Sequence, residues 1–237
     1  MRPCDAGKQI LAARDLSDRI KGMGQWLRST RVSDLSTASG RRLAWWHFQL
    51  VDHACLRALW SNWDQVAPGV YRSNHPGARR IAQLAAMGIK TLVSLRGTLP
   101  TSYNLLEAEA CASHGVTLVS HRLSSGLLPP RAELLALYQT FLSAQKPMVI
   151  HCKSGADRSG LAAALYQIMI CDAPVAVAAQ QLHWRYLHFK GGPRGVLDYM
   201  LAAYAQAQAE TGVSMLDWIT TTYDPVALTR VFKAGAR

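Results

Sequence analysis

The stretch KPMVIHCKSGADRSGLAAALYQIMIC, residues 146–171, contains the change of pattern that decides the fold. Residues 146–152 are mostly apolar, as in a buried strand, and residues 159–171 form a helix that is apolar nearly all round. The connecting loop holds glycines, a cysteine and an arginine, Cys152 and Arg158. We therefore expect a strand–loop–helix unit with the loop at the carboxyl end of the strand.

The same alternation extends on both sides of this unit. We predict strands over residues 69–73, 89–97, 116–123 and 146–152. Helices are predicted over 78–88, 104–115, 131–144, 159–171, 180–189, 196–212 and 214–219. Strands that alternate with helices indicate an α/β fold with a central, mostly parallel sheet flanked by helices, with extra N-terminal and C-terminal helices. In such sheets ligands bind beyond the carboxyl ends of the strands, where the Cys152 loop lies.

Composition indicates a globular protein with an anionic partner. The chain has 237 residues, 49% of them hydrophobic, with a formal net charge of +11. Such a charge favours phosphates, nucleic acid or an acidic membrane surface, although solubility alone would also explain it. We expect residues 1–63 to form an N-terminal helical and basic arm, and residues 64–237 an α/β domain with the C-terminal helices.

Cysteine usage and hydropathy indicate a reduced, cytoplasmic setting. The five cysteines are odd in number, irregularly spaced and contain no CxxC pair, so they predict neither a zinc site nor a disulfide framework. We expect no metal and no cofactor. Residues 1–30 lack the apolar stretch of a secretory signal, and the longest uncharged apolar run, between Ser159 and Asp172, is shorter than the ~20 residues of a membrane-spanning helix.

Residues 41–63 carry apolar side chains at helical spacing. Arg41 and Arg42 precede Trp45, Trp46 and Phe48, an order typical of an interfacial membrane anchor, which would place the protein peripherally at the inner membrane surface. A helix packed on the domain with its aromatic side chains in the core is the alternative. We favour the alternative because aromatic residues at helical spacing belong more often to a core.

The loop after the 146–152 strand suits the binding of an anion. Its N–H groups and the positive end of the following helix favour a thiolate, so we expect Cys152 to have a depressed pKa and to be nucleophilic. Gly155 and Gly160 allow a tight turn close to a ligand. Arg158 can hold two phosphate oxygens, and Ser159 can donate to the Cys152 sulfur. Together they predict phosphoryl transfer through a cysteinyl-phosphate; the alternative is a buried cysteine beside a surface arginine.

The loop HCKSGADRSG, residues 151–160, matches HCxxGxxR[ST]G and resembles the active-site loop of cysteine-dependent protein tyrosine and dual-specificity phosphatases, with His151 in its first position. The Asp before the arginine resembles a bacterial subset of these enzymes. The stretches GVYRSNHP (69–76) and GIKTLVSLRG (88–97) look like the entry to the catalytic domain of small bacterial and fungal members. The resemblance covers residues 66–188 and implies a phosphotyrosine phosphatase-like fold.

The resemblance also implies a role for each loop residue. Cys152 would be the nucleophile, Arg158 the phosphate binder and Ser159 the residue that assists breakdown of the intermediate. The backbone amides of the loop would bind the substrate phosphate. These amides belong to Lys153, Ser154, Gly155, Ala156 and the residues up to Arg158. A lysine after the nucleophile resembles phosphatases that act on phosphoinositides, although an exposed loop lysine is the simpler interpretation.

The general acid departs from the pattern of the resembled family. Many of these phosphatases use an Asp on a separate upstream loop, but this sequence has no Asp between Asp64 and Asp157. Glu133 is the one carboxylate between Glu109 and the loop, and we expect it to complement a helix dipole. Asp157 is then either the general acid or a structural carboxylate that pins the loop, and the sequence leaves both roles open.

Other charged residues and functions remain as alternatives. Arg96 and Arg122 end predicted strands, where they would either bind phosphate or be solvated. We expect phosphomonoester hydrolysis, with a phosphotyrosine or dual-specificity protein substrate, or a lipid or inositol phosphate. A non-catalytic phosphate- or phospholipid-binding module and sulfur transfer of the rhodanese kind are the competing functions. No nucleic acid partner is expected.

Overall fold

The computed structural model describes residues 34–235, apart from the side chain of Ala58. These residues form two compact units. One contains residues 34–56 and 100–106, and the other contains residues 57–99 and 107–235. The part of the predicted N-terminal arm that precedes residue 34 lies outside the described residues. Within residues 34–235, no helix combines the length and the apolar character needed to cross a membrane.

The helix expected over residues 41–63 is interrupted. Helix α2, Ala38–Trp46, continues into a π-helical turn, His47–Val51, and a separate 3₁₀ helix covers Ala54–Leu59. His53 has a φ of 59° and Asn62 a φ of 47°, backbone conformations that end a right-handed helix. Apolar periodicity survives across these breaks, which is why the sequence suggested one continuous helix.

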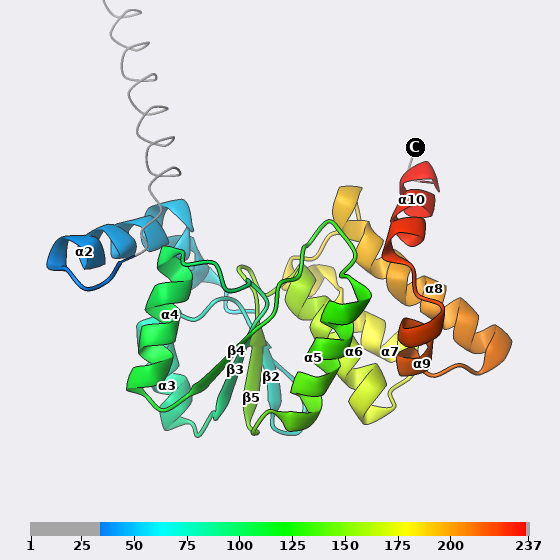
Figure 1. Ribbon diagram of the computed structural model, residues 1–237, viewed down its shortest axis with the longest axis horizontal. Helices are drawn as coiled ribbons and strands as arrows, with labels where there is room; N and C mark the ends of the chain where they lie inside the picture. The colour runs from blue at the N-terminus through cyan, green and yellow to red at the C-terminus, as the bar shows by residue number, and fades with distance from the viewer. Residues whose placement is uncertain (1–33, 236–237) are drawn as a thin grey trace, which may run out of the picture. The chain divides into compact units, whose positions relative to one another are not determined.

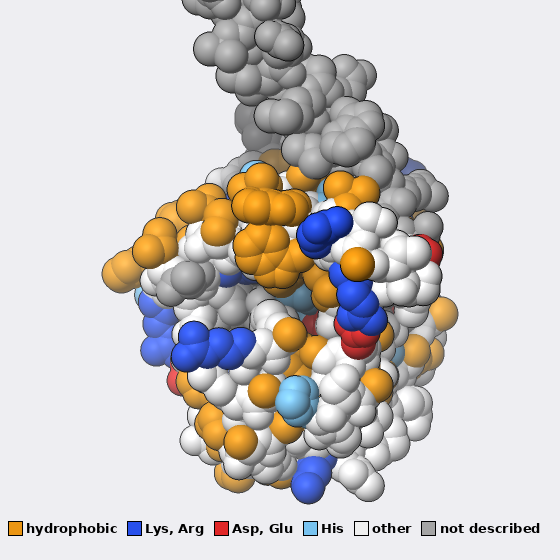
Figure 2. All heavy atoms as spheres, turned by 90° about the vertical axis from the view of Figure 1, so that its left-hand side faces the viewer, with side chains coloured by type: hydrophobic (Ala, Val, Ile, Leu, Met, Phe, Trp, Pro, Cys, Tyr) orange, Lys and Arg blue, Asp and Glu red, His pale blue; other side chains and the backbone are white. Residues whose placement is uncertain are grey.

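The aromatic side chains of this segment are not all in a core. Trp45 is 49% exposed and Trp46 is 52% exposed, whereas Phe48 is buried. The expectation of core aromatics therefore holds for Phe48 and is wrong for the two tryptophans. Figure 2 shows one face of the molecule, on which hydrophobic side chains gather close to Lys and Arg side chains.

The second unit contains a five-stranded sheet in the order β1-β2-β5-β3-β4. The strands are β1 (Asp64–Ala67), β2 (Val70–Ser73), β3 (Thr91–Ser94), β4 (Thr117–Ser120) and β5 (Met148–His151). All neighbours are parallel except β1, which pairs antiparallel with β2 through the turn at Gly69. The prediction of a mostly parallel sheet is confirmed, and β1 is an additional edge strand that the sequence did not suggest.

Helices cover both faces of this sheet (Figure 1). Helix α3 (Ala78–Ala86) and the part of α4 (Ser102–Ser113) from Glu107 onward pack on one face, around a cluster that includes Leu84, Leu92 and Cys111. Helices α5 (Arg131–Ser143) and α6 (Asp157–Cys171) pack on the other face. Burial on both faces explains why β3 and β5 are buried at every position.

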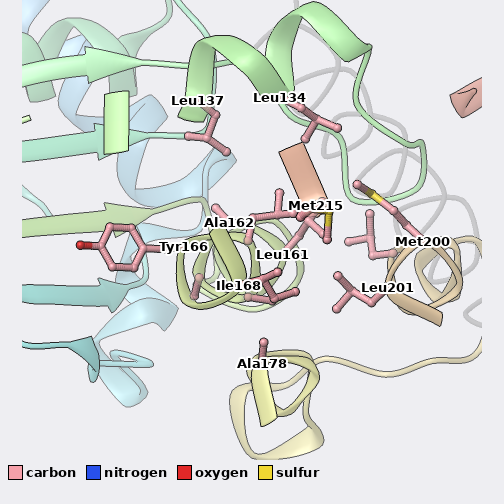
Figure 3. Packing of buried hydrophobic residues seen from close by; sticks show 14 of the residues in the cluster. Leu134, Leu137, Leu161, Ala162, Tyr166, Ile168, Ala178, Met200, Leu201 and Met215 are labelled. Atoms are coloured by element: carbon pink, nitrogen blue, oxygen red, sulfur yellow. The ribbon is translucent and has the colours of Figure 1, made fainter. Parts of the chain in front are cut away.

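Helix α6 is the centre of the larger core. Leu161, Ala162 and Tyr166 are almost fully buried, and Leu134, Met200 and Met215 approach the helix from other elements (Figure 3). The C-terminal helices complete this core and confirm the predicted extra helices at this end. They are α7 (Val175–Ala178), α8 (Val196–Thr211), α9 (Met215–Thr221) and α10 (Pro225–Gly235).

The predicted helix over residues 180–189 is wrong. The chain instead forms two short 3₁₀ turns, Ala179–Gln181 and Trp184–Tyr186. Leu187 then adopts a left-handed conformation with a φ of 64°, which turns His188 into the interior while Trp184 stays 69% exposed. Gly191 precedes a last 3₁₀ turn, Gly192–Gly195, which lies directly before α8.

Candidate active site

The loop that follows β5 carries the predicted nucleophile. β5 ends at His151 between its parallel neighbours β2 and β3, and α6 begins at Asp157. Cys152 is 1% exposed and Arg158 is partly exposed. The Nη1 of Arg158 lies 3.4 Å from the carbonyl oxygen of Leu95, at the end of the adjacent strand β3. The structure therefore places this loop, which we call the catalytic loop (152–159), where the sheet opens for a ligand.

Buried Arg72 holds the outside of the catalytic loop. Its side chain is fully buried, and its Nη2 donates to the carbonyls of Gly155 (2.6 Å) and Ala156 (3.1 Å). Its Nη1 donates to the backbone oxygen (2.7 Å) and the side-chain oxygen (2.8 Å) of Gln181. The guanidinium also stacks 3.8 Å from the ring centre of Tyr186. Burial lowers the pKa of Arg72 to about 10, still well above neutrality, so it remains a cation.

The remaining loop carbonyls are also held from outside. The carbonyl of Ser154 accepts from Asn62 Nδ2 (2.9 Å) and from the ring N–H of Trp60 (3.3 Å), and that of Lys153 accepts from the N–H of His75 (3.3 Å). Four successive carbonyls, 153–156, are therefore occupied by partners outside the loop. Because N–H and C=O point in opposite directions across a peptide, we expect the N–H groups of residues 154–157 to face the Cys152 side, as that of Gly155 does.

Gly155 in the loop and Gly160 directly after it are required by close packing against the protein. Gly155 has a φ of 74°, and a Cβ there would lie 2.7 Å from the backbone nitrogen of Asn74. A Cβ on Gly160 would lie 2.6 Å from the carbonyl oxygen of Gln181. Side chains at either position would push the loop away from its supports. These close contacts are with the protein's own backbone, and the predicted close approach to a ligand stays a prediction.

The environment of Cys152 favours the thiolate. Burial opposes ionisation, but the guanidinium of Arg158, the hydroxyl and N–H of Ser159 and the N–H of Gly155 outweigh it. The net result is a pKa of Cys152 below the ordinary value of a thiol. Cys111, which is buried near Glu107 instead, has its pKa raised by burial to about 12. Partners rather than depth therefore separate the two cysteines: the pKa of Cys152 is lowered and that of Cys111 is raised.

Asp157 belongs to a buried group that we call the aspartate-pair cluster: Asp157, His188 and Asp198. The His188 Nδ1 lies 2.8 Å from Asp157 Oδ1, and its Nε2 lies 2.8 Å from Asp198 Oδ2. Burial opposes a charge on His188, but the two hydrogen bonds raise its pKa to about 9. Arg194 Nε lies 3.7 Å from the other oxygen of Asp157. The general-acid role of Asp157 stays a prediction.

His151 belongs to a second buried group, the histidine-pair cluster: His75, Glu107 and His151. Glu107 Oε1 lies 2.8 Å from His151 Nε2 and 3.5 Å from His75 Nδ1, and all three side chains are at most 1% exposed. Among the described residues this group has the spacing of metal ligands. However, burial and then the charges of Arg96 and Arg57 lower the pKa of His75 well below its usual range, and the same positive charges oppose a metal cation.

The remaining predicted site residues lie after β3 and β4, in the first turn of α5 and in the loop itself. Arg96 and Arg122 face each other in an isolated antiparallel bridge after β3 and β4. Glu133, in the first turn of α5, accepts from the N–H of Arg122 (3.0 Å) and lies 3.0 Å from the ring of His121. Glu133 thus joins α5 to the end of β4, a structural contact. Lys153 is partly exposed in the loop next to Cys152.

Sequence reasoning missed several residues that support the loop. They are Asn62, Arg72, Glu107, Gln181 and Asp198. A signal existed for Arg72, because it is a charged residue within a predicted strand, next to Val70 and Tyr71. His188 lies in a segment that also contains Trp184, Arg185 and Lys190, and such a composition does not indicate that its side chain is buried.

The fold and the loop together resemble one class of enzymes. A parallel sheet whose central strand leads through the loop HCKSGADRSG into the start of a buried helix, with a cysteine beside an arginine, is similar to the arrangement of the cysteine-dependent protein tyrosine and dual-specificity phosphatase superfamily. No family model matches the sequence.

Particular relatives are found among bacterial proteins. The chain is 30% identical over 152 residues to "Dual specificity protein phosphatase TpbA" of Pseudomonas aeruginosa strain UCBPP-PA14 and 28% identical over 158 residues to TpbA of strain PAO1. It spans 62% of the length of these relatives, and the match covers 62% of this chain. A crystal structure of a mutant form of Tk-PTP matches 63% of this chain and 97% of its own with a TM-score of 0.50 and 16% identity, which supports the fold.

Proposed function

We propose that this protein is a phosphatase that hydrolyses phosphomonoesters through a cysteinyl-phosphate intermediate. The observation that carries the proposal is the buried Cys152 side chain beside Arg158 and Ser159: burial raises the pKa of the thiol, but Arg158, Ser159 and Gly155 together lower it below its ordinary value. A cysteine whose ionised form is favoured in this way is suited to attack phosphorus while a guanidinium and loop N–H groups hold the phosphoryl oxygens. The similarity to dual-specificity phosphatases supports the same activity.

The proposed reaction has two steps. The Cys152 sulfur attacks phosphorus, the bond from phosphorus to the leaving-group oxygen breaks, and that oxygen takes a proton from water or from a general acid. Water then attacks phosphorus and gives up a proton to solvent, the phosphorus–sulfur bond breaks, and phosphate leaves with the thiolate restored. Arg158 and the loop N–H groups at 153–158 bind the transferring phosphoryl oxygens in both steps, and Ser159 donates to the departing sulfur.

The test is hydrolysis of an aryl phosphate by the purified, reduced full chain. Cys152→Ser should abolish turnover, and Arg158→Lys should lower kcat/KM by about 10²–10³-fold, because a point charge replaces a two-pronged donor. Cys171→Ser, which changes an exposed cysteine, is the matched control and should retain activity. Turnover that survives Cys152→Ser would refute the proposal. Phosphate binding without turnover would instead favour a binding module.

Charge supports one class of substrate. The net charge of +11, Lys153 in the loop, and Arg96 and Arg122 after β3 and β4 favour a polyanionic substrate. We propose a phosphorylated protein, with phosphotyrosine as the first candidate, or an anionic lipid or inositol phosphate. A panel of phosphopeptides, inositol phosphates and phosphoinositides, compared by kcat/KM, separates these classes.

We propose that residues 64–237 carry the phosphatase, that residues 1–63 form an N-terminal arm, and that the arm contacts an anionic membrane surface from the cytoplasmic side through residues 41–63. Half-exposed Trp45 and Trp46 next to exposed Arg41 and Arg42 support this proposal. Cosedimentation with phosphatidylserine vesicles should fall strongly in a Trp45→Ala/Trp46→Ala variant and with rising salt. Equal binding to neutral vesicles would contradict the electrostatic part.

A further inference from the structure

The aspartate-pair cluster places one histidine between two carboxylates from different elements. Asp157 is the first residue of α6, Asp198 lies in the first turn of α8, and His188 comes from the segment between them. The His188 side chain is fully buried, and those of Asp157 and Asp198 are 10% and 20% exposed. The cluster thus joins the catalytic loop to the segment that precedes α8.

The geometry decides how protons are arranged. Each ring nitrogen of His188 lies 2.8 Å from a carboxylate oxygen. A neutral imidazole has one N–H and would satisfy one carboxylate, whereas an imidazolium donates to both. The pKa of His188, raised to about 9, agrees with the doubly donating form.

The charged groups around the cluster act on the same carboxylates. Lys190 Nζ lies 3.4 Å from Asp198 Oδ1, and Arg194 Nε lies 3.7 Å from Asp157 Oδ2. Both oxygens of Asp157 therefore face donors, His188 on one side and Arg194 on the other. A proton on Asp157 Oδ1 would oppose the N–H of His188, and a proton on Oδ2 would take the negative charge away from Arg194. A general acid must carry such a proton before the first step.

We infer that His188 is a positioning residue: it holds Asp157 as an accepting carboxylate, so that Asp157 fixes the start of α6 and the adjacent Arg158 and does not protonate the leaving group. This inference rests on the proposed phosphatase function for its kinetic test. It resolves the two roles that the sequence left open for Asp157 in favour of the structural one.

A leaving-group series distinguishes the two roles. The substrates are substituted phenyl phosphates whose phenols differ in acidity, with the full chain, Asp157→Asn and His188→Gln as enzymes. We expect each variant to lower kcat/KM about 10-fold for every substrate in the series, because a misplaced Arg158 affects all substrates alike. The double variant should be little worse than either single variant, since both break one link.

The contrary outcome is well defined. If Asp157 is the acid, Asp157→Asn should lower kcat/KM only a few-fold for the substrate with the most acidic phenol, and about 10²–10⁴-fold for the one with the least acidic phenol. The loss in His188→Gln should still be the same for every substrate. That result would overturn the inference. Asp198→Asn is a second variant that leaves Asp157 in place. We expect it to lower kcat/KM less than the other variants, again by the same factor for every substrate. Thermal unfolding of each variant confirms that the fold is retained.

A spectroscopic readout separates failure of this inference from failure of the proposed function. Nitrogen-15 NMR of histidine-labelled full chain reports the protonation of each imidazole, and the His188→Gln spectrum identifies the signal of His188. We expect His188 to stay doubly protonated at pH 7 and to titrate near pH 9, and to titrate at lower pH in Asp198→Asn. A neutral His188 at pH 7 would overturn the inference even if the wild type hydrolyses none of the phenyl phosphates.

Discussion

The two buried histidine clusters beside the catalytic loop use the same residue types to opposite effect. In the histidine-pair cluster, two imidazoles share the Glu107 carboxylate near Arg57 and Arg96, and the pKa of His75 falls well below its usual range. In the aspartate-pair cluster, two carboxylates share one imidazole, and the pKa of His188 rises to about 9. Burial acts in the same direction on both histidines, so the charged neighbours decide the outcome.

The histidines on the two sides of the loop therefore differ in the charge state that their surroundings favour. His75, which follows β2, favours the neutral form, and His188, in the segment before α8, favours the cation. The loop therefore lies between an uncharged imidazole on the β2 side and an ion-paired one on the α8 side. The stability of the protein should respond to pH in opposite directions through the two clusters.

Removal of the shared carboxylate should have the largest effect. Glu107→Ala takes away the group that both histidines approach and leaves a cavity, and we expect a loss of about 3 kcal/mol in the free energy of unfolding. Urea unfolding at pH 7 measures this loss. Glu210→Ala, which changes an exposed carboxylate on α8, is the control and should stay within about 0.5 kcal/mol of wild type. A loss of similar size in both variants would remove the basis for treating Glu107 as a shared partner.

His188→Gln should be the next most destabilising change, and its effect should depend on pH. The folded-state pKa is raised to about 9 from an unfolded value near 6.5, so the stabilisation is complete below about pH 6.5 and is lost as pH rises through about 9. We expect His188→Gln to lower the free energy of unfolding by about 1–2 kcal/mol at pH 6. This is less than the full pKa shift implies, because Asp198 is 20% exposed and solvent screens its charge. A gap between wild type and variant that stays constant up to pH 9.5 would contradict this.

His75 should give the opposite pH dependence. Its folded-state pKa is depressed, so stability is full above the unfolded pKa near 6.5 and falls as pH drops below it. The unfolding free energy of His75→Asn should therefore decline less steeply than that of wild type, by about 1 kcal/mol between pH 6.5 and 5.5. His114→Asn, at an exposed position, should retain the wild-type slope. Parallel slopes for all three proteins would show that His75 is not the acid-sensitive group.

An exposed ion pair provides the smallest effect. Arg185 Nη2 lies 2.8 Å from Asp64 Oδ2, with side chains 56% and 38% exposed. Arg185→Ala should change the unfolding free energy by at most about 0.5 kcal/mol, because solvent competes for both charges. Thermal unfolding at low and high salt checks this, and a loss as large as that of Glu107→Ala would show that burial does not separate these interactions.

The elements that were predicted correctly from the sequence have apolar patterns of their own. Strands β2, β3, β4 and β5 and helix α6 were predicted from their own apolar patterns. Strand β1 was missed because four residues, DQVA, carry little periodicity and depend on pairing with β2. The predicted helix at 180–189 failed because the aspartate-pair cluster draws His188 inward and forces Leu187 into a left-handed turn.

The site shows the same division. Cys152, Arg158 and Ser159 lie within one loop, so their spacing was enough to suggest their chemistry. The residues that set their geometry come from distant positions: Arg72 is 83 residues from Gly155, and His188 is 31 residues from Asp157. One sequence does not show that these positions meet, because the contacts depend on how β2 and the segment before α8 pack against the loop.

The grip of Arg72 on the loop has a further consequence for ligand affinity. Because the protein itself satisfies the carbonyls of residues 153–156, the shape of the loop does not depend on an oxyanion. An oxyanion therefore binds without a loss of conformational entropy in the loop, since that entropy has already been lost on folding. Ligand affinity and fold stability are coupled through one guanidinium, so a substitution that loosens Arg72 should weaken phosphate binding at temperatures at which the protein is still folded.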